Sequence, residues 1–114
     1  MNISLQNIFQ VNEDTPWENA GPGIKRQVYG YDKSVMLVKV AFEKGATGVL
    51  HEHMHVQVSY VESGRFEVTI GDEKKILKEG DGFYVPSHVI HGCICLEAGV
   101  LIDVFSPMRE DFIK

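Results

Sequence analysis

Gly45-Ala-Thr-Gly-Val-Leu-His51-Glu-His53-Met-His55-Val-Gln57 carries three of the five histidines of this 114-residue chain, at alternate positions. The last histidine, His91, follows a Gly-Asp-Gly-Phe-Tyr-Val-Pro turn that begins at Gly80. Side chains two residues apart on a strand point to the same side, and imidazole is the commonest metal ligand in proteins. The pattern therefore predicts strand-borne histidines that hold one metal ion.

Outward from this segment, strand-like runs alternate with turn formers at intervals of about ten residues. Strands are expected over 25–30, 35–43, 56–61, 66–70, 75–78, 83–85, 89–96 and 100–105, with turns at 32–33, 44–45, 62–64, 71–72, 79–82 and 97–99. The Gly71-Asp72 pair predicts a hairpin over 66–76. Only the tail 107–114 is a candidate for a short helical turn. Many short strands with regular turns predict an all-β sandwich or barrel.

The length is that of one domain, and we expect a single domain over 1–114 with no linker. Residues 1–22 are polar and rich in turn formers, which predicts an arm or a short edge strand held by Trp17. The net charge of −5 argues against nucleic acid and anionic membranes as partners. The N-terminus has no signal-peptide pattern and the only cysteines are Cys93 and Cys95, so we expect a reduced cytoplasmic protein.

The spacing of glycines, histidines and one proline resembles the two motifs of the cupin superfamily. The first motif would span 45–64, with Gly45, His51, His53 and a closing Gly64. The second would span 80–95, with Gly80, Pro86 and His91. The resemblance implies a double-stranded β-helix, a small jelly-roll barrel, with the metal inside the barrel mouth.

Carried over position by position, the resemblance implies that His51, His53, Gln57 and His91 are the metal ligands. Gln57 stands where glutamate is usual, His88 replaces an internal glycine, and Cys95 replaces a trailing asparagine. His55 is expected in the pocket and His88 at its rim, neither as a ligand. Cys93 and Cys95 share the parity of His91, and we interpret them as small buried side chains that could also face the cavity.

The amide at position 57 has chemical consequences. Three neutral imidazoles and one neutral amide leave the charge of a divalent ion uncompensated, which favours Lewis-acid work on an anionic, oxygen-rich substrate. The absence of a ligand carboxylate argues against iron oxidation. The donor set fits one divalent transition metal, Mn, Fe, Co, Ni or Zn, without selecting among them.

A second resemblance narrows the function. The tail Val100-Leu-Ile-Asp-Val-Phe-Ser-Pro-Met-Arg-Glu-Asp-Phe-Ile-Lys, together with Ser63-Gly-Arg-Phe-Glu-Val and His91-Gly-Cys-Ile-Cys-Leu-Glu, is similar to the pectin degradation cupins. The likeness runs nearly end to end and includes the glutamine at the fourth ligand position. It implies conversion of 4,5-unsaturated uronates from pectin or alginate breakdown to linear 4-deoxy-5-keto uronates.

The residues of the tail suit this chemistry. Leu101, Asp103 and Phe105 share one face of an otherwise apolar strand, so Asp103 is either a structural ion-pair residue or a general acid/base near the metal. Arg109 is either a surface charge or a fork for a substrate carboxylate. Phe105 could pack on the sugar or on the core. Weaker pocket candidates are Tyr60, Arg65 and Tyr84, whereas Lys25 and Arg26 are expected on a solvated strand.

Two other functions remain open from the sequence. A non-catalytic cupin module could bind a sugar or a metal, and a three-histidine cupin dioxygenase could use the same ligands. A cavity blocked by apolar side chains would favour the module, and a requirement for oxygen would favour the dioxygenase. By analogy with small cupins we expect a homodimer.

Overall fold

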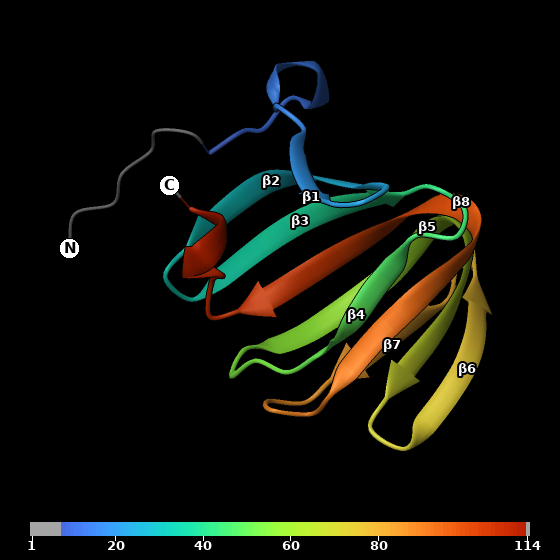
Figure 1. The fold of residues 1–114 in the computed structure, drawn as a ribbon. Helices are drawn as coiled ribbons and strands as arrows, with labels where there is room; N and C mark the ends of the chain where they lie inside the picture. The colour runs from blue at the N-terminus through green and yellow to red at the C-terminus, as the bar shows by residue number, and fades with distance from the viewer. Residues whose placement is uncertain (1–7, 114) are drawn as a thin grey trace.

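The computed structural model describes residues 8–113, and the arm residues 1–7 and Lys114 lie outside this range. Figure 1 shows strands in two facing layers, with the C-terminal turn beside β2 and β3. The strands are β1 (Glu18–Gly21), β2 (Ile24–Asp32), β3 (Val35–Phe42), β4 (Thr47–His51), β5 (Val56–Ile70), β6 (Glu73–Lys78), β7 (Gly82–Val85) and β8 (His91–Ser106). Two short 3₁₀ turns, Asn12–Asp14 and Glu110–Phe112, complete the described chain. The all-β expectation is confirmed, and the tail does form a helical turn.

All pairings are antiparallel, in the order β1-β2-β3-β8-β5-β6, with β4 on β8 and β7 on β5. Strand β8 pairs with β4 through its first part and with β3 through its second part, while β5 follows it along nearly its whole length. The two long strands therefore pass from one layer to the other, as a jelly-roll barrel requires. The 66–76 hairpin is confirmed by the β5–β6 pairing.

The expected turns at 62–64 and 97–99 are wrong, because both lie inside the continuous strands β5 and β8. The register shifts on either side of Ser63, which marks a bulge rather than a chain reversal. Gly64 has φ +85°, and a Cβ there would lie 2.6 Å from the Cα of Gly99. The glycines let two strands touch as they bend between the layers.

The core lies between the layers. One apolar cluster centres on Phe42 and Phe66, whose ring centroids are 5.2 Å apart, and a smaller one contains Met36, Val38 and Phe105. Each fully buried large apolar side chain contributes about 2 kcal/mol. Burial of Leu101, Asp103 and Phe105 confirms the parity expected for the last strand. No helix among residues 8–113 has the length and apolar character needed to cross a membrane.

Candidate metal centre and cavity

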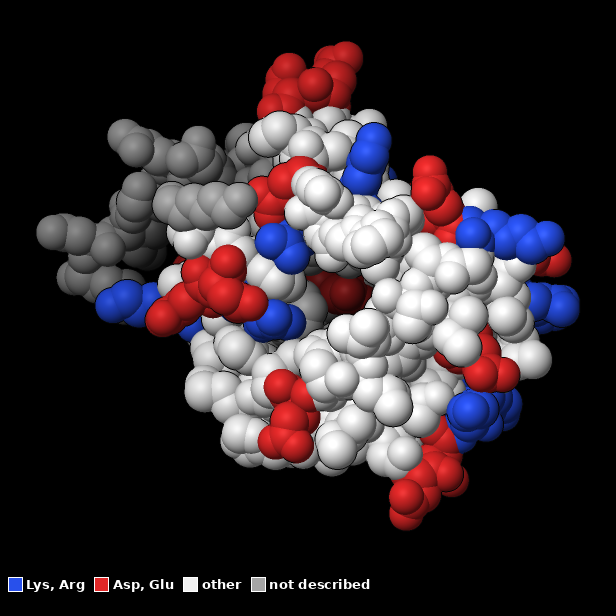
Figure 2. All heavy atoms as spheres, viewed as in Figure 1, with Lys and Arg blue, Asp and Glu red and all other residues white. Residues whose placement is uncertain are grey.

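A cavity of about 420 Å³ opens between the layers, and Figure 2 shows it as a hollow with acidic atoms at its floor. Its lining includes His51, Gln57 and His91, the expected ligands apart from His53. Among the described residues that line it, Asp103 is the one acidic side chain. The volume is that of a small-molecule site.

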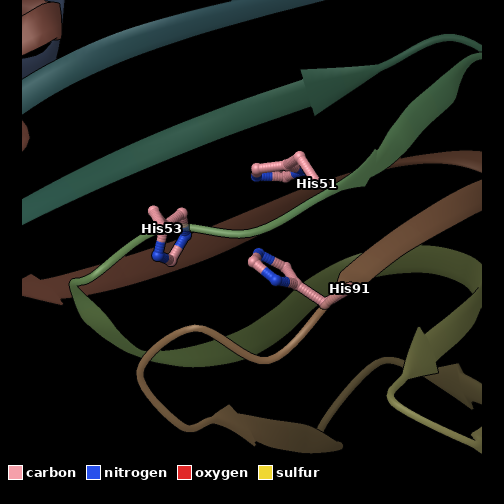
Figure 3. Close-up of side chains that lie close together, drawn as sticks. All are labelled: His51, His53 and His91. Carbon is pink, nitrogen blue, oxygen red and sulfur yellow. The ribbon is translucent and has the colours of Figure 1, made fainter.

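The three histidines point toward one another in Figure 3, from β4, from the loop that follows it and from the start of β8. Ligand nitrogens of His51, His53 and His91 all lie within 4.8 Å of one another. His51 and His91 face each other across the β4–β8 pairing. Strand β4 ends at His51, so His53 reaches the cluster from a loop, and the strand alternation expected for this pair is wrong.

That loop is tied to the second motif. The backbone N–H of His88 donates to the carbonyl of His53 over 2.8 Å, and Ser87 Oγ donates to the carbonyl of Met54 over 2.5 Å. These two bonds fix the position of the loop at His53, where no strand pairing does so.

The hydrogen bonds of the rings fit a cation. Each Nδ1 of the three histidines lies 2.8–3.0 Å from a backbone carbonyl, of Val49, His55 and Val89 respectively. A carbonyl only accepts, so each neutral ring carries its proton on Nδ1 and presents a lone pair on Nε2. Nε2 of His91 is buried with no hydrogen-bond partner among the described residues. These are the donor atoms that a divalent transition metal takes.

A buried row of polar side chains connects the histidine cluster to the carboxylate of Asp103. Oε1 of Gln57 lies 3.2 Å from Nε2 of His53, and Nε2 of Gln57 donates to Ser59 Oγ over 2.9 Å. Ser59 Oγ in turn donates to Oδ1 of Asp103 over 2.6 Å. Sequence reasoning missed Ser59, although its parity with Gln57 on one strand was a usable signal.

Burial sets the protonation states of the site. It lowers the pKa of His91 to about 4, helped by the charges of His51, His53 and Arg109. Burial also lowers the pKa of His53. The same effect raises the pKa of Asp103 to about 6, against the opposing hydrogen bond from Ser59 and the charge of Arg109. The two histidines are thus neutral at pH 7, as metal binding requires.

Arg109 borders the cavity from the C-terminal tail. Its Nε and Nη2 atoms form a bidentate pair with Asp111, at 3.0 and 2.8 Å. Its guanidinium carbon lies 4.3 Å from the Phe112 ring centroid and 5.2 Å from that of Phe105. The structure therefore brings Arg109 and Phe105 to the same cavity as Asp103, and the surface position considered for Arg109 is wrong.

The expectation of a solvated Arg26 is also wrong. Its side chain is only 18% exposed, lines the cavity, and pairs with Glu18 over 2.6 Å. Its guanidinium carbon lies 3.8 Å from the centroid of the Phe112 ring. Alternation along β2 could have indicated that Arg26 faces inward, because Ile24, two residues earlier, is buried. Lys25 is exposed, as expected.

Most of the other candidates lie away from the cavity. Tyr60 and Tyr84 are half exposed and Arg65 is exposed, and none of the three lines the cavity, so their pocket assignment is wrong. His88 is exposed and lies 3.5 Å from Glu52, in keeping with a rim position. The ring of His55 lies against His53 and Phe105 outside the cavity lining, so its expected place in the pocket is wrong. Cys93 lines the cavity and Cys95 belongs to the core.

Comparison with known proteins identifies the relatives of this chain. A family model described as a cupin domain matches residues 38–105. The pectin degradation protein KdgF of Dickeya dadantii (strain 3937) is 48% identical over 107 residues, which cover 92% of this chain and 97% of that protein.

Many solved structures share the fold, and two of the most similar are these. An RmlC-like cupin from Shewanella frigidimarina NCIMB 400 superposes with a TM-score of 0.91 at 49% identity, covering 93% of this chain and 96% of that one. KdgF from Halomonas sp. has a TM-score of 0.89 at 40% identity, covering 92% and 99%.

Proposed function

This chain belongs to the cupin family and groups with the pectin degradation protein KdgF, and from that premise we propose that it opens the ring of 4,5-unsaturated uronates. The product would be the linear 4-deoxy-5-keto uronate. The observation that carries the proposal is a buried carboxylate, Asp103, in one cavity with converging imidazoles and a guanidinium. These groups provide a proton carrier, a metal centre and an anion contact.

We propose that His51, His53, Gln57 and His91 hold one divalent transition metal. The converging Nε2 lone pairs and the Gln57 Oε1 atom support this ligand set. When bound, the ion supplies Lewis-acid stabilisation of negative charge on substrate oxygens, undiminished by any ligand carboxylate. Mn, Fe, Co, Ni and Zn all suit these donors.

Asp103 is the proposed general acid/base. Its carboxylate accepts the proton of the hemiacetal hydroxyl, and the ring C–O bond breaks to give an aldehyde and an enolate. The same carboxyl group returns the proton to C4, which converts the enolate to the 5-keto form, so the reaction is an isomerisation without redox change. A pKa of about 6 suits a group that must both take and give a proton near neutral pH.

Arg109 is the proposed contact for the substrate carboxylate. Asp111 occupies the Nε–Nη2 edge of the guanidinium, which leaves the Nη1–Nη2 edge for a second fork. Phe105 lies beneath this group at 5.2 Å and offers an apolar face for the sugar ring. The two residues would orient the uronate over Asp103.

The test uses the purified protein, its metal content from elemental analysis, and unsaturated galacturonate released by a pectate lyase. The enol-ether ultraviolet absorbance should disappear faster than in buffer, with chelation abolishing the acceleration and anaerobic incubation leaving it unchanged. Asp103→Asn should keep the metal and lose about 10²–10⁴-fold in rate. No acceleration with either galacturonate-derived or alginate-derived substrate would overturn the proposal.

We also propose a homodimer formed by an outer face of the sheet. Val58, Tyr60 and Tyr84 are each at least half exposed, and Val58 pairs directly with Tyr84 across β5 and β7. Such a contiguous apolar strip favours association with a second copy. Sedimentation velocity should give a dimer, and Tyr84→Asp should shift it to monomer. A monomer at all concentrations would refute the proposal.

We propose a reducing, cytoplasmic location on the basis of the thiols. Both cysteines are free, and the half-buried Cys93 and the buried Cys95 form no disulfide in residues 8–113. Free thiols persist where the cell keeps them reduced. Fractionation of cells that express the protein tests this location.

A further inference from the structure

Three buried side chains form a single hydrogen-bonded row beside the cavity, which Gln57 and Asp103 line. Gln57 and Ser59 face inward from β5, and Ser59 lies opposite Asp103 in the β5–β8 pairing. Their exposed fractions are 6%, 3% and 8%. The row ends at His53 on one side and at the Asp103 carboxylate on the other.

We propose that Ser59 is a positioning residue that fixes the direction of the Gln57 amide. We further infer that an amide stands at position 57 because Asp103 takes the one proton that Ser59 can donate. The inference rests on the proposed metal site and on Asp103 as the acceptor of the Ser59 proton, and it explains how the two are built together.

The direction of the Gln57 amide follows from the number of protons that the row holds. A serine hydroxyl donates once and can accept twice, whereas a carboxylate only accepts. The 2.6 Å contact therefore carries the Ser59 proton to Asp103. The 2.9 Å contact between Ser59 and Gln57 must then be donated by the amide N–H. This turns Oε1, the only amide atom able to bind a metal, toward Nε2 of His53.

The opposite amide orientation is incompatible with a bound metal. The amide N–H would donate to Nε2 of His53 and use the lone pair that the ion needs, and Oε1 would lie beside Ser59 Oγ, whose single proton already goes to Asp103. A buried acceptor left without a donor is costly. Asp103 thus sets the orientation of Gln57, a proposed metal ligand that lies two hydrogen bonds away.

A glutamate at position 57 would break the row for the same reason. It adds a second acceptor to Ser59 and a second negative charge to a buried wall whose one hydroxyl proton is already used. Both effects destabilise the metal-free protein. If position 103 held asparagine, however, its N–H could donate to Ser59. The Ser59 proton would then go to the new carboxylate at position 57, and a complete row would run in the reverse direction.

A double-mutant cycle tests this reasoning in metal-free protein. Gln57→Glu should lower the Tm by about 5 °C or more. In the Asp103→Asn background the same substitution should lower it by less than about 2 °C. Equal shifts in the two backgrounds would show that Gln57 and Asp103 are not coupled, and would overturn the inference.

Metal binding gives the second measurement, with Co²⁺ alone as the probe and its visible spectrum as the signal. Ser59→Ala should weaken Co²⁺ binding by about tenfold, the usual loss when a partner of a metal ligand is removed. Ser59→Thr, which keeps the hydroxyl, should restore most of it. A Ser59→Ala protein with a lower Tm but unchanged Co²⁺ affinity and spectrum would show a merely structural serine and would refute the positioning role.

Neither measurement uses a uronate, so failure of this inference can be distinguished from failure of the proposed function. Coupling in the cycle without uronate turnover supports this inference and overturns the proposed function. Turnover with additive shifts supports the function and overturns the inference. Failure of the unmodified protein to bind Co²⁺ overturns the proposed metal site and the positioning role together.

Discussion

The guanidinium carbon of Arg26 lies 3.8 Å from the centroid of the Phe112 ring, at the border of the cavity. The contact joins an early strand to the last turn of the described chain. The same ring lies 4.3 Å from the guanidinium carbon of Arg109. Arg26 therefore supports the aromatic ring on which the proposed carboxylate contact rests.

Arg26→Ala should raise KM for the unsaturated uronate by about tenfold, because a partly buried cation–π contact contributes about 1–2 kcal/mol. The kcat should change by less than about threefold, since the carboxylate is held equally in ground and transition states. Steady-state kinetics measure both, and Lys25→Ala on the exposed side of β2 is the matched control. A fall in kcat at constant KM would contradict this role.

Asp103→Asn should stabilise the metal-free protein at neutral pH. The folded-state pKa of Asp103 is raised from 3.8 to about 6, so the ionised form above pH 6 destabilises the fold by up to about 3 kcal/mol. As the pH falls from 6 to 3.8 the folded protein binds a proton that the unfolded chain does not, and this cost disappears. The free energy of unfolding of the variant should therefore exceed that of the unmodified protein at pH 7.5, and the two should be nearly equal at pH 4.

Urea unfolding at the two pH values measures this difference. Ser106→Ala, at an exposed position on the same strand, is the control for changes unrelated to burial. An Asp103→Asn variant with the same relative stability at both pH values would show that the carboxyl carries no such cost.

His88→Gly should raise the free energy of unfolding by about 0.5–1 kcal/mol, because His88 has φ +63°, where a Cβ is disfavoured. Its exposed contact with Glu52 contributes little that would be lost. Thermal unfolding measures the gain, and Co²⁺ affinity should be unchanged because the side chain lies outside the cluster. A loss of Co²⁺ binding would make His88 part of the centre.

The two thiols should react slowly in the folded protein. Burial raises the pKa of Cys93 to about 11, and it raises the pKa of Cys95 as well. At pH 8 the thiolate fraction of Cys93 is then about a hundredfold below that of a free cysteine, and labelling by a thiol reagent should slow by at least that factor. Comparison with urea-unfolded protein measures the ratio. Fast labelling of the native state would show that the cavity wall opens.

The histidine and glycine spacing carried the resemblance to the cupin motifs, and that resemblance predicted both the jelly roll and the cluster of His51, His53 and His91. Spacing is informative here because short strands with regular turns have few ways to close, and each motif glycine marks a bend. The sequence also predicted that Asp103 faces inward, since alternation along a strand is a local property. The roles of Gln57, Arg109 and Phe105 remain predictions.

Other features depended on contacts between distant segments. The glycines of 62–64 and 97–99 suggested two turns, but they meet each other across β5 and β8 and so allow continuous strands to bend. Arg26 looked solvated because its partners, Glu18 and Phe112, come from β1 and the C-terminal turn. A local pattern cannot show which remote side chain will cover a residue.

By itself, the sequence determined an all-β sandwich or barrel and the inward face of the last strand, because these follow from periodicity. Its resemblance to the cupin motifs indicated the jelly roll and the imidazoles that converge. Tertiary structure alone decided which side chains form hydrogen bonds with one another and how burial shifts their pKa values. It placed Ser59 between Gln57 and Asp103, and it raised the pKa of Asp103 where the sequence left the sign open. Desolvation and hydrogen bonding depend on what the completed fold packs around a group, and no local stretch of chain contains that information.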